Sequence, residues 1–131
     1  FINGGSINGV IAHEDYEGIK NDDGDVFISG GTIRILANGN GSRGIQTDGN
    51  MTITADAGNT NIYVEANGGL CTDPADSVDP HRCMGIKVGQ NLTITGGTIQ
   101  VKATGNKARS IRVNGVYSNT GGTVDAIISQ P

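Results

Sequence analysis

The stretch LTITGGTIQVKATG, residues 92–105, occurs a second time in the chain with little change. Residues 26–39 read VFISGGTIRILANG, with the same Gly-Gly-Thr-Ile at the centre. The equivalent glycines begin at residues 4, 30, 58, 96 and 121, in steps of 26, 28, 38 and 25. A second marker (EGIK at 17, RGIQ at 43, MGIK at 84, RSIR at 109) has steps of 26, 41 and 25. Two markers with one period indicate a repeat protein with an insertion between Gly69 and Met84.

Each repeat predicts three short β-strands, because the apolar residues alternate with polar ones. Equivalent positions then fall into inward-facing ladders, since successive side chains of a strand point to opposite faces. A single repeat has no second apolar face against which to bury its strands, so the repeats must stack and share one interior. The expected ladders are Ile28, Ile53 and Ile94; Val26, Met51 and Leu92; Ile7, Ile33, Ile62, Ile99 and Val124; and Ile19, Ile45, Ile86 and Ile111.

The fold class that this pattern favours is an all-β right-handed parallel β-helix with three parallel sheets. Parallel crossovers are overwhelmingly right-handed. About five coils of 25–26 residues form one domain over residues 1–131, with a loop inserted at 70–84. The 22 glycines in 131 residues fit the corners, and Gly30-Gly31, Gly96-Gly97 and Gly121-Gly122 are expected where the chain bends sharply.

Composition excludes several classes of protein. The net charge is −4 and the pI about 4.9, whereas a nucleic-acid-binding domain needs a basic surface. We therefore expect no nucleic-acid partner. No apolar run approaches the roughly 20 residues of a membrane helix, so we expect no membrane insertion either. The sequence begins with Phe1 and no signal-peptide pattern, as expected of a mature or excised piece.

The insertion carries the only two cysteines, Cys71 and Cys83. A zinc site would need two more ligands, and only His81 is near in sequence. We therefore expect a disulfide that closes the loop, which in turn predicts an oxidising environment at the cell surface or outside the cell.

Two acidic segments are candidate calcium sites, because Ca²⁺ prefers oxygen ligands. The insertion contains Asp73, Asp76 and Asp79. A corner of the repeat contains Asp22, Asp23 and Asp25, and Asp48 occupies the same corner one repeat later. The alternative is that these aspartates form turns, for which their side chains are well suited.

One outward row of the third strand offers hydrogen-bond donors for an anionic polysaccharide: Lys20, Gln46, Lys87 and Arg112. The alternative is an ordinary polar surface. Tyr63 is a further ligand candidate, although five aromatic residues and no Trp argue against an aromatic sugar-stacking platform. Asn40, Asn50 and Asn91 lie in Asn-x-Ser/Thr sequences and are possible glycosylation sites.

The repeated line resembles bacterial carbohydrate-binding-domain proteins with a right-handed parallel β-helix. The resemblance covers about residues 17–125, through GIKNDDGDVFISGGTIRILANG, GIQTDGNMTITADAG and GIKVGQNLTITGGTIQVKATG. It implies an extracellular or surface location and polysaccharide binding, sometimes with calcium. The insertion flanked by cysteines and the segment VYSNT at residues 116–120 depart from the repeat.

Two functions follow from the sequence. No nucleophile or zinc motif is present, so we expect a protein that is not an enzyme. The segments at the two ends, FINGGSI and TVDAIISQP, carry no polar cap, which favours a scaffold whose copies stack head to tail into a filament. The alternative is a polysaccharide-binding module, with or without calcium.

Overall fold

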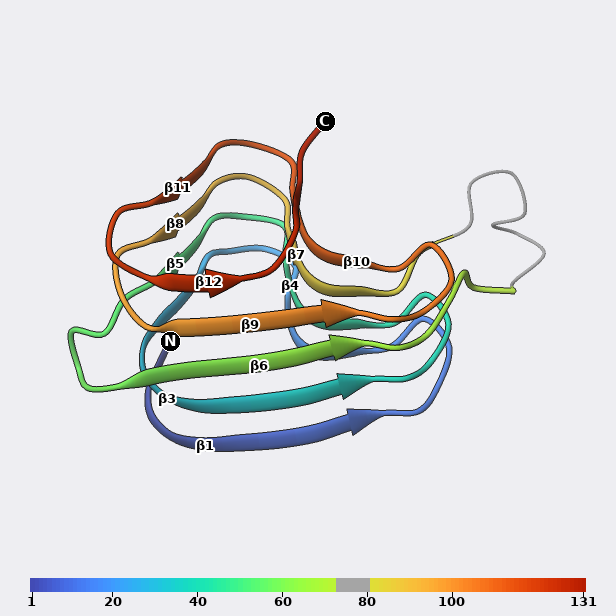
Figure 1. Cartoon of the computed structure of the whole chain (residues 1–131), viewed down its shortest axis with the longest axis horizontal. Helices are drawn as coiled ribbons and strands as arrows, with labels where there is room; N and C mark the ends of the chain where they lie inside the picture. Colours follow the sequence, from blue (N-terminus) through green and yellow to red (C-terminus); the bar gives the residue numbers. More distant parts are fainter. Residues whose placement is uncertain (73–80) are drawn as a thin grey trace.

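The computed structural model describes residues 1–72 and 81–131, which fold into β-strands without a helix (Figure 1). All pairings between the named strands are parallel, and none of the described residues forms a helix suited to crossing a membrane. The strands are β1 (Ile2–Ile11), β2 (Glu17–Asn21), β3 (Val26–Ala37), β4 (Arg43–Thr47), β5 (Met51–Ile53), β6 (Thr60–Ala66), β7 (Met84–Val88), β8 (Leu92–Ile94), β9 (Thr98–Ala103), β10 (Arg109–Val113), β11 (Tyr117–Asn119), β12 (Thr123–Asp125) and β13 (Ile128–Ser129).

The strands form two sheets, so the expectation of three sheets is wrong. The eight-stranded sheet has the order β11-β8-β5-β3-β6-β9-β12, with β1 beside β3, and the five-stranded sheet has the order β13-β10-β7-β4-β2. The first two predicted strands of a repeat join in β3, which continues across the Gly30-Gly31 corner. Gly31 turns the chain with a φ of 101°, which a residue with a side chain rarely adopts, while hydrogen bonding continues on both sides.

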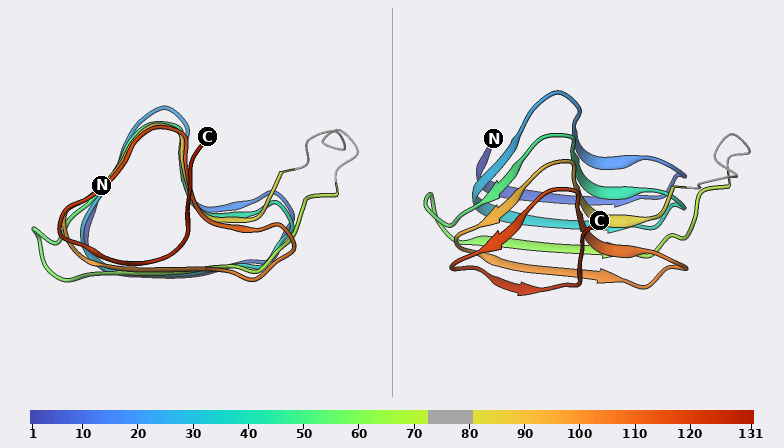
Figure 2. Two further views of the ribbon diagram at one scale, coloured as in Figure 1. Left: turned by 45° about the horizontal axis from the view of Figure 1, so that its top comes forward. Right: turned by 90° about the horizontal axis from the view of Figure 1, so that it is seen from above.

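The predicted ladders are confirmed by the strand register. Ile33 lies opposite Ile7 on one side and Ile62 on the other, and Ile62 lies opposite Ile99. On the five-stranded sheet, Ile45 lies between Ile19 and Ile86. Figure 2 shows successive repeats stacked almost in superposition, so that most ladder residues are fully buried between neighbours of the same kind.

Small residues let the two sheets approach each other closely. A Cβ atom added at Gly44 in β4 would lie 2.5 Å from Val64 Cγ1 of β6. At Gly85 in β7 it would collide with Val101 Cγ1 of β9. The valines of the eight-stranded sheet occupy the space beside the second position of the marker, which therefore holds a small residue, glycine in three repeats and Ser110 in the fourth.

The five-stranded sheet bends directly after these glycines. Gly44 and Ile45 are consecutive, yet both face the interior, since Ile45 is fully buried and the Gly44 Cβ direction points at Val64. The chain turns away from the eight-stranded sheet at this point and leaves a concave outer corner (Figure 2, left). Outward side chains on the two sides of this bend therefore point toward each other.

We predict that Gly44→Ala destabilises the protein by about 1–3 kcal/mol, because the added methyl group overpacks the contact between the sheets. It would lie 2.6 Å from the Gly85 carbonyl oxygen as well as against Val64. Urea unfolding measures the change. Gly9→Ala is the matched control, because its methyl group would meet no atom within 4 Å. Equal stability of the two variants would contradict the close-packing interpretation.

Candidate functional site

The four polar residues predicted on the third strand form one continuous row. Lys20 lies opposite Gln46, Gln46 opposite Lys87, and Lys87 opposite Arg112. We call Lys20, Gln46, Lys87 and Arg112 the polar row. It crosses β2, β4, β7 and β10, so one ligand lying across these strands would meet a polar side chain on each.

Two buried polar atoms at the centre of this surface lack a hydrogen-bond partner among the described residues: Gln46 Oε1 and Arg43 Nε. Gln46 is only 7% exposed and Arg43 only 6%. Arg43 points outward, because its neighbour Gly44 faces the interior. It precedes the bend and Gln46 follows it, so the two residues lie on the two sides of the bend. Buried polar groups usually have partners, and such exceptions need an explanation.

The N-terminal half of this surface is charge-balanced. Arg43 Nη1 lies 3.4 Å from Asp15 Oδ1 and 3.5 Å from Glu17 Oε1. Lys20 Nζ lies 3.8 Å from Glu17 Oε1 and 3.5 Å from Asp22 Oδ1. These ion pairs hold Arg43 by Nη1 and leave its Nε directed elsewhere.

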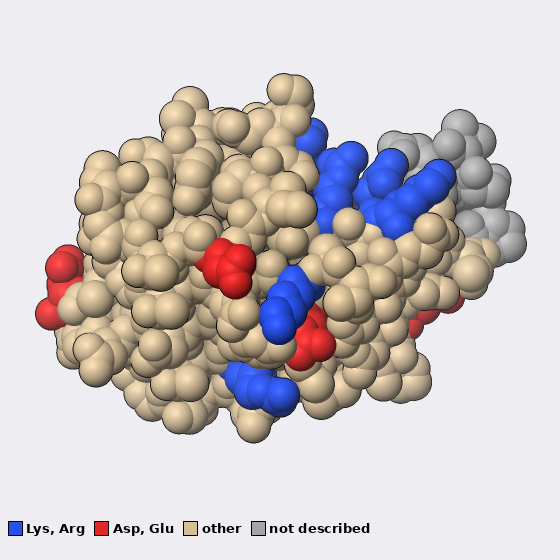
Figure 3. Space-filling model, in the orientation of Figure 1, with Lys and Arg blue, Asp and Glu red and all other residues tan. Residues whose placement is uncertain are grey.

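The C-terminal half has positive charges without carboxylate partners. Within residues 1–72 and 81–131, no carboxylate lies within ion-pair distance of Lys87, Arg109 or Arg112. Burial lowers the pKa of Lys87, and the charges of Arg43 and Arg112 add to this effect. Burial also lowers the pKa of Arg109, with repulsion from Arg82 and Arg112. Figure 3 shows Lys and Arg side chains gathered near β10.

Tyr63 lies on the other sheet, so the structure does not bring it together with the polar row. It projects from the outer face of β6, between Arg34 of β3 and Gln100 of β9. Its hydroxyl donates a 2.6 Å hydrogen bond to Glu65 Oε2. This bond raises the pKa of Tyr63 and lowers that of Glu65. The predicted ligand residues therefore divide between two surfaces.

The acidic corner does not form a metal site among the described residues. Asp22, Asp23, Asp25 and Asp48 line one shallow hollow, but nowhere in the described ranges do three acidic, His or Cys side chains meet closely enough to bind an ion. Asp25 Oδ1 instead accepts a 2.8 Å hydrogen bond from the Asn50 backbone N–H, and Asp22 pairs with Lys20. The turn-forming interpretation fits these bonds. Asp73, Asp76 and Asp79 lie outside the described residues.

The asparagines of the three predicted glycosylation sequences connect adjacent repeats. Asn50 Oδ1 accepts a hydrogen bond from Asn91 N–H, and Asn91 Oδ1 accepts one from Val116 N–H. Asn40 Oδ1 accepts one from Gly69 N–H. These bonds explain why asparagine occupies the corners, while glycosylation of any of the three stays a prediction.

The structure contains no disulfide between Cys71 and Cys83, contrary to the expectation from sequence. Cys71 N–H donates to the His81 carbonyl and Cys83 N–H to the Gly69 carbonyl, around the antiparallel bridge of Leu70 and Arg82. The two cysteines are therefore diagonal neighbours, whose Cα atoms are typically about 7–8 Å apart, beyond the usual disulfide range. Cys83 instead donates its thiol to the Ala37 carbonyl at 3.3 Å.

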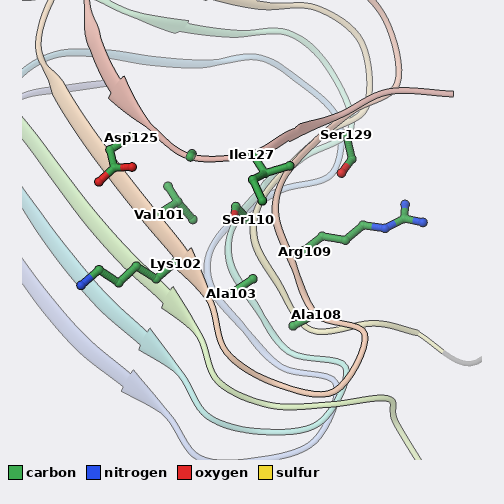
Figure 4. A pocket seen from close by; sticks show the side chains of 10 residues that line it. Val101, Lys102, Ala103, Ala108, Arg109, Ser110, Asp125, Ile127 and Ser129 are labelled. Atoms are coloured by element: carbon green, nitrogen blue, oxygen red, sulfur yellow. The ribbon is translucent and has the colours of Figure 1, made fainter.

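A hollow at the C-terminal end of the stack is not a good site for a polar ligand. It has a volume of about 480 Å³ and lies between β9 and β10. Figure 4 shows Ile127 reaching over its centre, with Val101 and the small residues Ala103 and Ala108 around it. The charged ends of Lys102 and Arg109 point away from this hollow, in different directions.

Sequence reasoning missed Arg43 and Arg109, which lie in the same register position of β4 and β10. Simple alternation from Ile45 assigns Arg43 to the interior, because the two residues are two positions apart. The bend at Gly44 reverses that assignment. The bend could have been predicted from the small second residue of the marker, which is Gly18, Gly44, Gly85 and Ser110 in the four repeats.

The chain belongs to a family described as carbohydrate-binding domain-containing proteins, whose model matches residues 1–130. The comparisons with curated proteins and with solved structures give no match. The family name describes a binding domain and no reaction, so the expectation that the protein is not an enzyme stays a prediction.

We predict that both cysteines take up an alkylating reagent when the protein is unfolded without a reductant, giving two adducts by mass spectrometry. In the folded protein Cys83 should resist the reagent, because it is fully buried and burial raises the pKa of its thiol. A peptide linked through Cys71 and Cys83 in a non-reduced digest would contradict the structure.

Proposed function

We propose that this protein binds an anionic polysaccharide along the polar row and the adjoining Arg43. The observation that carries the proposal is the pair of buried, unpartnered atoms, Gln46 Oε1 and Arg43 Nε. Membership of a carbohydrate-binding family supports the same function.

A bound sugar supplies what these two atoms lack. Leaving a buried donor or acceptor unsatisfied costs about 1–3 kcal/mol. A sugar hydroxyl both donates and accepts, so it can serve Gln46 Oε1 and Arg43 Nε once the two side chains turn outward, since both atoms are buried in the free protein. The free protein would thus carry two unsatisfied groups, at the expense of its stability.

The charge of the surface favours acidic groups on the ligand. Lys87, Arg109 and Arg112 have no ion pair in the described part of the chain, and Arg112 repels both Lys87 and Arg109, although Asp48 and Glu17 partly offset the repulsion at Lys87. A carboxylate or sulfate on the sugar would relieve that repulsion and accept charge-assisted hydrogen bonds.

The repeat favours a polymer over a single sugar. Neighbouring strands lie about 4.7–4.9 Å apart, so the polar row presents one side chain at each such step across four strands. A chain of similar units crossing the strands can form comparable contacts at each step, and several weak contacts add up to useful affinity.

The proposal extends to the finer fold and the location. The stacked parallel strands and their register support a right-handed β-helix of five coils, with the residues at 70–84 as its insertion. An extracellular or cell-surface location is where a polysaccharide of this type would be met. End-to-end stacking into a filament gains no support from the family or from a described contact, and it stays a prediction.

We predict that Lys87→Ala and Arg112→Ala each weaken binding to an acidic polysaccharide about tenfold, because each removes a charged hydrogen-bond donor. Affinity electrophoresis in gels containing alginate, hyaluronan or a sulfated glycan measures the change, and added salt should weaken wild-type binding further. Lys102→Ala is the control, since Lys102 lies on β9 of the other sheet. The absence of any acidic glycan that retards the wild-type protein would overturn the proposed function.

A second prediction separates stability from binding. Gln46→Leu keeps a similar volume but removes the unpartnered amide oxygen, so unfolding should require about 1 kcal/mol more, while sugar binding weakens about fivefold. Urea unfolding and affinity electrophoresis measure the two changes on one sample. A variant that binds like the wild type would show that Gln46 has no part in the site.

A further inference from the structure

We propose that the outer face around Tyr63 is a second glycan site, for an uncharged polysaccharide, and that the molecule bridges two polysaccharide chains. The bridging part rests on the proposed function, because it needs the polar row to hold the other chain. The Tyr63 face itself is argued from separate residues and does not depend on that function.

The Tyr63 face has a hollow beside a fixed aromatic ring. The hollow measures about 220 Å³ and is bordered by Thr32, Arg34, Asn61, Tyr63, Thr98 and Gln100. These side chains come from three neighbouring strands, with Arg34, Tyr63 and Gln100 opposite one another in register. Amide and hydroxyl groups beside the Tyr63 ring suit a sugar, whose C–H face is apolar and whose rim carries hydroxyls. The Arg34 and Lys102 side chains lie over the ring, so a sugar that packs against the ring displaces one of them.

The ring is held in one orientation by its neighbours. Its hydroxyl bonds Glu65 at 2.6 Å, and Glu65 in turn accepts a 3.3 Å bond from Asn67 Nδ2. The Arg34 guanidinium carbon lies 5.7 Å from the ring centroid and the Lys102 ammonium 5.8 Å from it. A preorganised ring loses little conformational entropy when a ligand packs against it.

The charges on this face cancel, unlike those near the C-terminal end of the polar row. Arg34 and Lys102 lie beside Glu65, and Gln100 Nε2 donates to Asp125 Oδ2 at 3.4 Å. Figure 3 shows Lys and Arg side chains alternating with Asp and Glu over this part of the molecule. A balanced surface does not favour acidic ligands, so the Tyr63 face fits an uncharged glycan.

The two surfaces lie on different sheets. The inner faces of β4 and β7 pack against those of β6 and β9, through Gly44 and Gly85 on one side and Val64 and Val101 on the other. The polar row follows the bend after Gly44 and Gly85 on the five-stranded sheet, whereas Tyr63 lies on the outer face of β6 in the eight-stranded sheet. Chains bound at the two surfaces would lie on different sheets, so one molecule can hold both.

A sandwich assay tests the proposal. Beads that carry alginate are loaded with protein and washed, and labelled uncharged polysaccharides (a soluble β-glucan, a galactomannan and a dextran) are then added separately. Gel retardation by the same uncharged polymers is measured in parallel. The variants are Tyr63→Ala, the double variant Lys87→Ala/Arg112→Ala, and Tyr16→Ala as control, since Tyr16 is a 61% exposed tyrosine outside both surfaces.

We expect the wild type and Tyr16→Ala to capture at least one uncharged polymer on the beads. Tyr63→Ala should load normally but lose at least about 90% of the capture. The double variant should fail to load, yet be retarded by the uncharged polymer like the wild type.

Two results would overturn the second site: no uncharged polymer that retards the wild-type protein, or retardation of Tyr63→Ala equal to that of the wild type. Failure of the wild type to load on alginate or any other acidic glycan, with retardation by an uncharged polymer intact, would overturn the proposed function and the bridging. Thermal unfolding of each variant checks that it is folded.

Discussion

The parallel register between successive repeats is the constraint on which the whole structure depends. Because each residue lies opposite its equivalent in the next repeat, an apolar position must be apolar in nearly every repeat, and a corner must bend in each. The isoleucine ladders, the glycines between the sheets and the asparagines at the corners are three results of this rule. Stability comes from stacking like on like, as a sum of contributions from the repeats and from the contacts between neighbouring repeats.

The same register produces the candidate site. A surface position repeats across the strands just as a core position does, so a favourable polar residue becomes a row without any loop to position it. The row differs from a regular surface where the pattern is broken. Gln46 and Arg43 are buried, and Lys20 and Arg43 have carboxylates within ion-pair distance, whereas Lys87 and Arg112 have none within residues 1–72 and 81–131. The residues proposed to bind the ligand are therefore those that depart from the regular pattern of the repeats.

Sequence alone predicted the strands, the ladders and the membership of the polar row, because all of these depend only on period and alternation. It did not predict that two strands fuse into β3, since that depends on whether hydrogen bonding survives a turn at Gly31. It also missed Arg43, because the bend at Gly44 is a packing effect of Val64, some 20 residues further along the chain. The diagonal placement of Cys71 and Cys83 required three-dimensional neighbours that spacing does not give.

The packing of the two sheets on each other has an evolutionary consequence. Each repeat contributes a strand to both sheets, so each repeat also contributes to both outer faces. Duplication or loss of one repeat would therefore lengthen or shorten both faces by one strand at once. The two surfaces can change independently in chemistry, by substitution of outward residues, but their lengths are inherited together.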